Sequence, residues 1–247
     1  MRYLGGKTKL ANRIAQAILD HTPRRGRYVE PFVGAGSVLM AVHGHFSEYL
    51  ASDIHPDLIM LYHKIQEDGI DWMPDWVSRE EWERLKNQPP SALRGLVGFG
   101  GSYGGRWFEG YARRRRGDDS SNTTGEAKRS FAKQMDSIMA TEFSCLSYDE
   151  VDVRPGDVVY CDPPYAGRKG YSGTEEFDHD RFWKTAEEWS RTADVFVSEY
   201  EAPPGWKEIA SIEHQVTMMI KGKSMVRDRL FTRLGDEAGS DHRDQIP

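Results

Sequence analysis

The sequence predicts an α/β fold in which helices cover both faces of a mainly parallel sheet. Strand-like and helix-like segments alternate along the chain with short links between them, which is typical of such sheets. Two runs, DVVYCD at 157–162 and DVFVSEY at 194–200, have the continuous apolar character of buried strands. Ligands of such sheets bind at the carboxyl ends of the strands, so we expect the functional residues there.

The first part of the chain supplies an N-terminal helix and two strand–helix units. In chain order we expect a helix at 9–19, a strand at 27–30, a helix at 37–44, a strand at 49–53 and a helix at 56–66. The apolar residues Leu10, Ile14 and Ile18 recur at helical spacing and define one side of the first helix. Pro56 fits the first turn of its helix, because the missing N–H has no partner there.

The middle of the chain indicates an insertion into the sheet domain. A helix at 78–86 ends before Pro89 and Pro90. Residues 95–125 are rich in glycine, arginine and aromatic side chains and show no clear period, so we expect loops there. A helix at 127–140 is expected to return the chain to the sheet.

The inserted segment also differs in charge from the rest of the chain. Residues 94–133 contain nine basic and four acidic side chains, although the whole chain has a net charge of −6. An acidic body with one basic segment indicates a localised contact with a polyanion. A solvated loop is the alternative interpretation.

The last part of the chain returns to the alternating pattern. After the strand at 157–162 we expect a helix at 180–192, a strand at 194–200 and an antiparallel pair of strands at 214–220 and 228–234. The remaining residues, 235–247, form a polar tail that we expect to be flexible.

Length and composition exclude several classes of protein. The 247 residues fit one domain with an insertion. No apolar run approaches the roughly 20 residues that cross a bilayer, and Lys7 and Arg13 interrupt any apolar signal segment at the start. The two cysteines, Cys145 and Cys161, are too few for a disulfide framework or a zinc site. We therefore expect a cytoplasmic protein with no membrane contact and no metal.

The first motif, YLGGKTKL at 3–10, contains Gly6-Lys7-Thr8, which matches the end of a nucleotide-binding P-loop. A P-loop also needs a glycine five residues before Gly6 and a strand that leads into the loop. The residue at that position is Met1, so the phosphate-binding interpretation fails and Lys7 needs another role.

The second motif is EPFVGAGS at 30–37, followed by Asp53 at the end of the next strand. Gly34 and Gly36 lie where a strand turns into a helix, and glycine allows a ligand to approach the backbone closely there. Asp53 follows Gly36 by 17 residues, a spacing at which a strand-end carboxylate binds ribose hydroxyls. Purely structural glycines and an N-cap role for Asp53 are the alternatives.

The third motif is Asp162-Pro163-Pro164-Tyr165, which follows the apolar residues DVVY of the first buried run. Two prolines hold the chain extended and donate no backbone hydrogen bonds. They therefore fix one carboxylate and one aromatic ring at the end of a strand. Asp162 and the Pro163 carbonyl could accept hydrogen bonds from a planar amine while Tyr165 stacks on its ring; a simple turn is the alternative.

In this order, RYLGGK, EPFVGAGS, the strand-end Asp53 and DPPY make the sequence resemble the Dam-type DNA adenine-N6 methyltransferases. The resemblance implies a Rossmann-like class I methyltransferase fold, S-adenosylmethionine as methyl donor and an adenine flipped out of double-stranded DNA. It also implies a catalytic domain at 1–92 and 148–234, with an inserted target-recognition region at 93–147.

The resemblance assigns roles to individual residues. For the base and the reaction they are Asp162, Pro163, Pro164 and Tyr165. For the donor they are Tyr3, Gly6, Lys7, Glu30, Pro31, Phe32, Gly34, Ala35, Gly36, Ser37, Asp53 and Asp162. Many relatives have a tryptophan at position 3; Tyr3 could still stack on or flank the cofactor.

The basic segment is then expected to face DNA. Arginines bind phosphates, and aromatic side chains contact bases. The candidates are Tyr103, Arg106, Trp107, Arg113, Arg114, Arg115 and Arg116, with Phe108 and Tyr111 as further aromatic contacts. The recognition sequence is not predicted.

Two alternatives in function stay open at this point. The acceptor could be cytosine N4, RNA or a protein amide, although an aspartate at position 162 favours adenine on family grounds. A DNA-binding relative without turnover is the second alternative. A cognate or evaded restriction endonuclease, and an origin in a bacterium, a phage or a mobile element, are further expectations.

Overall fold

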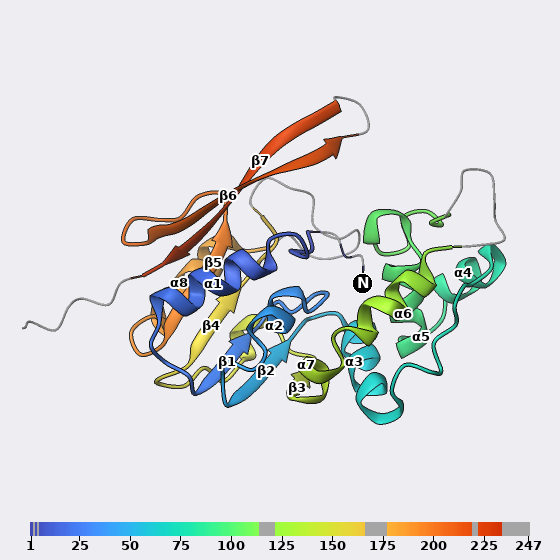
Figure 1. Cartoon of the computed structure of the whole chain (residues 1–247), viewed down its shortest axis with the longest axis horizontal. Helices are drawn as coiled ribbons and strands as arrows, with labels where there is room; N and C mark the ends of the chain where they lie inside the picture. Colours follow the sequence, from blue (N-terminus) through green and yellow to red (C-terminus); the bar gives the residue numbers. More distant parts are fainter. Residues whose placement is uncertain (2, 4, 114–121, 166–176, 219–221, 234–247) are drawn as a thin grey trace, which may run out of the picture.

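The structure is a computed structural model that describes residues 1, 3, 5–113, 122–165, 177–218 and 222–233. Within these residues one sheet has seven strands in the order β3-β2-β1-β4-β5-β7-β6 (Figure 1). The strands are β1 (Arg27–Glu30), β2 (Glu48–Ser52), β3 (Thr141–Ser144), β4 (Val158–Cys161), β5 (Asp194–Glu199), β6 (Lys207–Met218) and β7 (Gly222–Thr232). Strands β1 to β5 are parallel, whereas β7 is antiparallel to β5 and β6. The predicted mainly parallel sheet with an antiparallel C-terminal pair is confirmed.

Helices cover both faces of this sheet. They are α1 (Ala11–His21), α2 (Ser37–Val42), α3 (Pro56–Asp68), α4 (Arg79–Lys86), α5 (Ala92–Gly95), α6 (Thr124–Ala132), α7 (Met135–Met139) and α8 (His179–Trp189). No helix of the described residues combines the length and the apolar character needed to span a bilayer.

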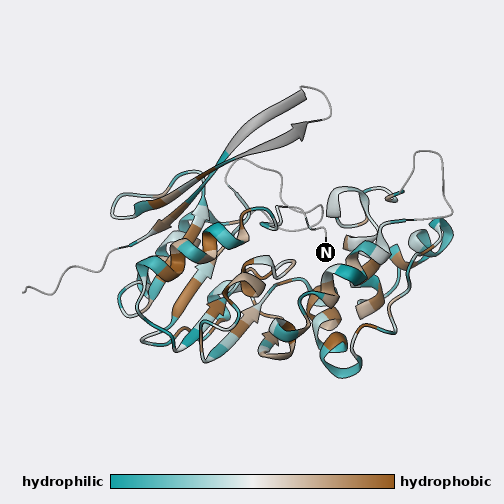
Figure 2. Cartoon of the chain, viewed as in Figure 1, coloured by the Kyte–Doolittle hydropathy of each residue, from teal (hydrophilic) through white to brown (hydrophobic). Residues whose placement is uncertain are grey.

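Strand β4 shows how the two faces are built. Its side chains point alternately to opposite faces, as in any strand. Val158 and Tyr160 join the core that contains the buried side chains of α1, α2 and α3. Val159 and Cys161 join the second core, under α8. All four side chains of β4 are buried. Helix α1, in contrast, has a hydrophilic outer side (Figure 2).

The inserted region has a small core of its own. Helices α4, α5 and α6 gather beyond α3 (Figure 1). A small core beside α4 and α5 contains Trp82, Val97 and Phe108, and the Trp82 indole N–H donates a hydrogen bond to Ser102 Oγ at 2.9 Å. The buried α6 side chains Ala127 and Phe131 belong instead to the main core with α1, α2 and α3.

The expectation of loops at 95–125 is wrong for its first part. Leu96–Gly100 forms a buried π-helix that follows α5 directly. Its glycines serve close packing instead of loop formation: a Cβ on Gly98 would lie 2.3 Å from the Trp107 ring, and one on Gly100 would lie 2.6 Å from Ala127 Cβ. Composition alone does not distinguish these two uses of glycine.

Two further elements differ from the sequence expectation. The helix expected at 127–140 is divided into α6 and α7, and the chain turns at Gln134, whose buried amide donates to Ser130 in the preceding turn. Strand β3 was not expected, and it pairs in parallel with β2 although it lies within the range 93–147 assigned to the insertion. Its four residues, TEFS, contain no apolar run that signals a strand. The tail at 235–247 lies outside the described residues.

A glycine at the contact between α5 and α3 tests this packing. A Cβ on Gly95 would lie 2.3 Å from the Asp57 carbonyl oxygen, a rigid backbone atom. We expect Gly95→Ala to lower the free energy of unfolding by about 1–3 kcal/mol despite the better helix propensity of alanine. Urea unfolding measures this. Gly26→Ala is the control, since nothing lies within 4 Å of its Cβ; an equal effect of both changes would contradict the packing.

Candidate active site

The predicted motifs converge at one edge of the sheet. Strands β2, β1 and β4 are neighbours and parallel, so their carboxyl ends lie side by side. EPFVGAGS continues β1, Asp53 follows β2 and DPPY follows β4. The N-terminal segment is connected to the same edge through Tyr3 and Lys7.

The glycine turn after β1 is tightly enclosed. Gly34 and Gly36 have φ angles of +46° and +67°, which residues other than glycine rarely adopt. A Cβ on Gly34 would lie 3.0 Å from the Tyr3 ring, and one on Gly36 would lie 3.0 Å from the Tyr62 hydroxyl. Tyr62 donates a hydrogen bond to the Gly34 carbonyl at 2.9 Å. The turn therefore requires both glycines.

Asp53 is bonded directly to this turn. Its Oδ2 accepts a hydrogen bond from the Gly34 N–H at 3.1 Å, and its Oδ1 accepts one from the His55 N–H at 3.0 Å. The N-cap alternative is not observed, because His55 is the N-cap of α3. Burial raises the pKa of Asp53 to about 6, and the backbone N–H groups of His55 and Gly34 oppose this shift. Ile54, the next residue, is 69% exposed.

Lys7 lies in the centre of a buried charged cluster. Its Nζ is 2.8 Å from Asp162 Oδ1 and 3.8 Å from Asp228 Oδ1. The same ammonium lies 4.5 Å from the centroid of the Tyr165 ring. The Tyr165 hydroxyl donates a hydrogen bond to Asp228 Oδ1 at 2.8 Å. Lys7 thus compensates two carboxylates.

The charges of this cluster affect one another. Burial raises the pKa of Asp162, Lys7 opposes the shift and Asp228 adds to it. Burial, followed by the two carboxylates, raises the pKa of Tyr165 well above its ordinary value, so its hydroxyl stays a donor. Asp162 Oδ1 is buried and forms an ion pair with the Lys7 ammonium at 2.8 Å. An amine that took the place of this ammonium could donate a hydrogen bond to the same oxygen.

Other residues of the EPFVGAGS motif have interior contacts. Glu30 is buried and accepts a hydrogen bond from the Tyr28 hydroxyl at 2.8 Å; burial raises its pKa well above the ordinary range. The Phe32 ring stacks on Tyr148 on the α8 side of the sheet. Pro31 and Ala35 are buried, and Ser37 Oγ lies 3.1 Å from the Thr8 hydroxyl. Contact of these five residues with a donor stays a prediction.

The residues expected to face DNA differ in exposure. Tyr103 is exposed, and Arg106 is exposed beside Glu109. Trp107 is half-buried, and its ring centroid lies 4.1 Å from that of His55. Phe108 is only 4% exposed, and this burial argues against insertion of its ring between DNA bases.

The remaining members of the basic segment are less completely described. Arg113 is exposed, and Arg114, Arg115 and Arg116 lie outside the described residues. Contact of the segment with DNA stays a prediction.

The sequence analysis did not identify Asp228 or Ile54 as site residues. Asp228 lies on a strand that was expected only as part of an antiparallel pair. The one signal for Ile54 was its position directly after Asp53.

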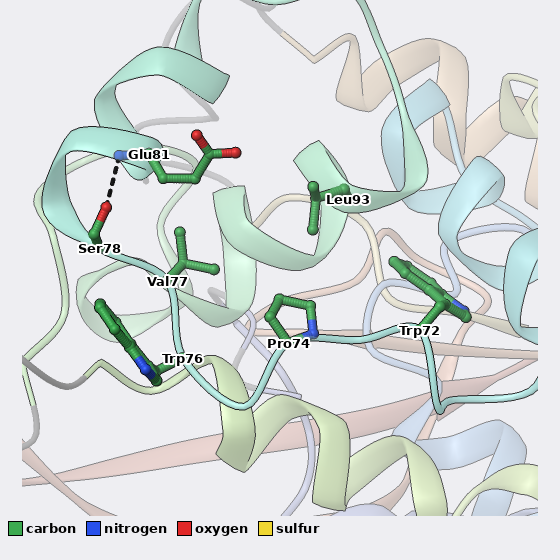
Figure 3. A pocket seen from close by; sticks show the side chains of 7 residues that line it. All are labelled: Trp72, Pro74, Trp76, Val77, Ser78, Glu81 and Leu93. Carbon is green, nitrogen blue, oxygen red and sulfur yellow. Dashed lines mark hydrogen bonds between the residues drawn. The ribbon is translucent and has the colours of Figure 1, made fainter.

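Two pockets lie among the described residues. One, of about 450 Å³, is lined by Trp72, Pro74, Trp76, Val77, Ser78, Glu81 and Leu93; its two tryptophans lie at opposite ends (Figure 3). None of these residues belongs to the strand-end loops. The other, of about 300 Å³, is lined by His179, Trp183, Glu199, Tyr200 and Glu201. It touches the site through Tyr200, whose ring packs edge-on against Tyr165 at 4.6 Å.

A sequence profile of the D12 class N6 adenine-specific DNA methyltransferases matches residues 3–92 and 109–203. The chain belongs to this family. The match covers all three strand-end motifs and omits 93–108, part of the inserted region. Together with the strand order, membership in the family identifies the sheet as the Rossmann-like class I methyltransferase fold.

Individual members of the family have similar sequences. A DNA adenine methylase of Vibrio cholerae serotype O1 is 30% identical over 186 residues, which are 67% of this chain and 64% of that protein. A DNA adenine methylase of Salmonella typhi is 31% identical over 187 residues, with the same shares. The retron Ec67 DNA adenine methylase of Escherichia coli is 29% identical over 199 residues, 73% of this chain and 68% of its own. The chain thus spans 64% of the length of the first two relatives.

Solved structures are less similar. The N-methyltransferase NodS of Bradyrhizobium japonicum aligns with 91% of this chain and 94% of its own, at 6% identity and a TM-score of 0.42. The 23S rRNA methyltransferase ErmE aligns with 94% of this chain and 70% of its own, at 10% identity and a TM-score of 0.40. We infer no function from similarity at this level.

Removal of Lys7 tests the charged cluster. Lys7→Met leaves two buried carboxylates uncompensated, and we expect it to lower the free energy of unfolding at pH 8 by about 2–4 kcal/mol. Without Lys7, burial and Asp228 raise the pKa of Asp162 further. The folded variant then binds protons more tightly than the unfolded chain, so its stability falls as pH rises.

Urea unfolding at pH 5 and pH 8 measures this difference, which we expect to be larger at pH 8. Lys64→Met, which removes an exposed ion pair with Asp68, is the control and should change stability little at either pH. Equal losses for Lys7→Met at both pH values would contradict the interpretation.

Proposed function

We propose that the protein is a DNA methyltransferase that transfers a methyl group from S-adenosylmethionine to N6 of an adenine flipped out of double-stranded DNA. The observation that carries this proposal is the position of Asp162. It lies at the end of β4, beside the strand that leads into the glycine turn, and its buried Oδ1, now paired with the Lys7 ammonium, can accept a hydrogen bond from an amine that takes the place of the ammonium. The family and the relatives named DNA adenine methylases support the same reaction.

The residues at the ends of β1 and β2 fit the donor. Gly34 and Gly36 hold the turn in left-handed conformations, and the Tyr3 and Tyr62 side chains fill the space where their Cβ atoms would lie, so the donor would approach the turn from its other side. Each Asp53 oxygen accepts one backbone hydrogen bond and has a further lone pair for a ribose hydroxyl. Exposed Ile54 would pack on a flat ring, and Tyr3 borders the turn. The donor supplies a methyl group carried on a positively charged sulfur.

The residues after β4 fit the acceptor. The N6 amine of adenine is a weak nucleophile, since its lone pair is conjugated with the ring. Hydrogen bonds from this amine to Asp162 and to the Pro163 carbonyl would favour a pyramidal nitrogen whose lone pair points away from them. Lys7 now occupies the position beside Asp162 Oδ1, so the incoming amine takes over the contact of the ammonium. The carboxylate then stabilises positive charge that develops on N6 and can accept the proton that N6 releases.

The free-energy cost of base flipping can be compared with the gains from stacking and from positioning. Correct positioning of two reactants can supply up to roughly 7–11 kcal/mol of barrier reduction in ideal cases. Flipping a base out of a duplex costs a few kcal/mol. Stacking of a base on an aromatic ring such as Tyr165 contributes about 1–3 kcal/mol. The Tyr165 ring can therefore offset much of the flipping energy.

The basic segment supports double-stranded DNA as the substrate. Arg106 and Arg113 are exposed, and the segment between residues 94 and 133 is positive on an otherwise acidic chain. Such contacts give salt-dependent affinity for phosphates. The retron relative suits a role in a bacterial mobile element, and a cognate or evaded restriction endonuclease stays a prediction.

Loss of the Asp162 side chain tests the proposal. We expect Asp162→Ala to reduce methyl transfer at least about a thousandfold, because both the hydrogen bond and the charge at N6 are lost. Donor affinity should change little. Transfer of tritiated methyl groups to DNA without prior adenine methylation measures the rate, and calorimetry measures donor binding. Asp152→Ala, an exposed aspartate that precedes β4, is the control; full activity of Asp162→Ala would contradict the assignment.

The raised pKa of Asp53 predicts a pH dependence of donor binding. The ionised carboxylate is the better acceptor for ribose hydroxyls, and its pKa is about 6. Lowering the pH from 7.5 to 5 should therefore weaken donor binding by about tenfold, as the ionised fraction falls. Asp53→Asn should bind more weakly and lose this dependence, which separates Asp53 from the nearby His55 ring. Calorimetry across this range measures both, and an unchanged pH profile in Asp53→Asn would refute the role.

A further inference from the structure

We propose that Asp228 is a positioning residue of the active site. It would act through Tyr165, whose ring it fixes, and through Lys7, to which it offers a second carboxylate. This inference rests on the proposed function and adds to it a residue from the C-terminal hairpin.

The topology of the hairpin brings Asp228 to the site. Strand β7 is antiparallel to β5, and Glu199 at the end of β5 pairs with Arg229. The residue before Arg229 therefore lies at the edge where the parallel strands have their carboxyl ends. The loop after β4 is at the same edge, because β4 and β5 are parallel neighbours.

Burial distinguishes Asp228 from the charged residues around it. Its side chain is 10% exposed, whereas that of Arg227 is 53% exposed and forms an ion pair with Glu213 across the hairpin. A buried carboxylate is unfavourable unless it is hydrogen-bonded or paired. The Tyr165 hydroxyl and the Lys7 ammonium provide such contacts, and both belong to the proposed catalytic centre.

The first consequence concerns the orientation of the Tyr165 ring. Stacking on a flipped base requires a fixed ring plane. The Tyr200 ring packs edge-on against Tyr165 at an interplanar angle of 79°, and Asp228 holds the hydroxyl at 2.8 Å. These contacts hold two points of the ring, so its plane is defined before a base arrives.

The second consequence concerns the charge of Lys7. When an amine takes the place beside Asp162, the ammonium must find another partner within the buried site. Asp228 Oδ1 is already 3.8 Å from Nζ, so a small movement of the side chain forms a close ion pair there. Asp228 would therefore allow Lys7 to yield to the acceptor without leaving a buried charge unpaired.

A double-mutant cycle on the rate of methyl transfer tests this role. The variants are Asp228→Asn, Tyr165→Phe and their combination, assayed with tritiated donor and unmethylated DNA at saturation. We expect Asp228→Asn to lower kcat by about tenfold, because the amide removes the charge beside Lys7 and weakens the hydrogen bond from the Tyr165 hydroxyl. Tyr165→Phe should lower it at least about threefold. Tyr165→Phe should lower kcat less in the Asp228→Asn background than in the wild-type protein, because the two changes act on the same contact.

The fluorescence of 2-aminopurine gives a second readout, which reports how far the base is flipped out of the duplex. In a duplex that carries 2-aminopurine at the methylated position, identified from the product of the wild-type protein, Asp228→Asn should reduce the fluorescence increase on binding. Donor affinity by calorimetry should change less than about threefold. The control is Asp194→Asn, which removes a carboxylate bonded to Thr22 and Arg24 at the opposite end of β5. Its effect on kcat should be small and additive with that of Tyr165→Phe.

Additive effects of Asp228→Asn and Tyr165→Phe on kcat would overturn the inference, as would a wild-type kcat in Asp228→Asn. If Asp228→Asn does not fold, Tyr165→Phe alone tests the inference. A wild-type kcat of Tyr165→Phe would then show that the hydroxyl contact with Asp228 has no role in transfer. Absence of methyl transfer by the wild-type protein would instead overturn the proposed function, and this inference with it.

Discussion

The buried contact of Lys7 with Asp162 is the interaction on which the site depends. It joins the N-terminal segment to the loop after β4, and through Asp228 it includes the C-terminal hairpin. Three segments that are far apart in the sequence are thus held around one ammonium. Two carboxylates share this charge, and in the proposed reaction one of them is passed to the substrate amine. Lys7 resembles a P-loop lysine in sequence but binds carboxylates instead of a phosphate.

The sheet places this cluster beside the glycine turn. Neighbouring parallel strands put EPFVGAGS, Asp53 and DPPY at a common edge, and β7 adds Asp228 because it is antiparallel. Gly34 donates a hydrogen bond to Asp53, whereas Asp162 and Tyr165 contact Lys7 and Asp228. The proposed donor side and the proposed acceptor side therefore have separate networks. This separation is the reason why we expect a change at Asp162 to affect transfer more than donor binding.

Much of this arrangement could be predicted from the sequence, and the exceptions have physical reasons. The strands at 157–162 and 194–200 were predicted because their apolar runs are continuous. Strand β3 was missed because TEFS has no such run and is stabilised mainly by pairing with β2. The π-helix at Leu96–Gly100 was missed because its glycines indicate a loop, although they serve close contact with Trp107 and Ala127. Asp228 was missed because only the antiparallel pairing of β7, which is a long-range contact, brings it to Tyr165.

The central claim is that Asp162 presents an exocyclic amine of adenine to a methyl donor, and the chemical identity of the product tests it most directly. Unmethylated DNA is incubated with the wild-type protein and S-adenosylmethionine whose methyl group carries a stable isotope, then digested to nucleosides and analysed by mass spectrometry. We expect the isotope label in N6-methyladenine. Label found only in N4-methylcytosine, or no labelled nucleoside from a protein that binds both donor and DNA, would contradict it.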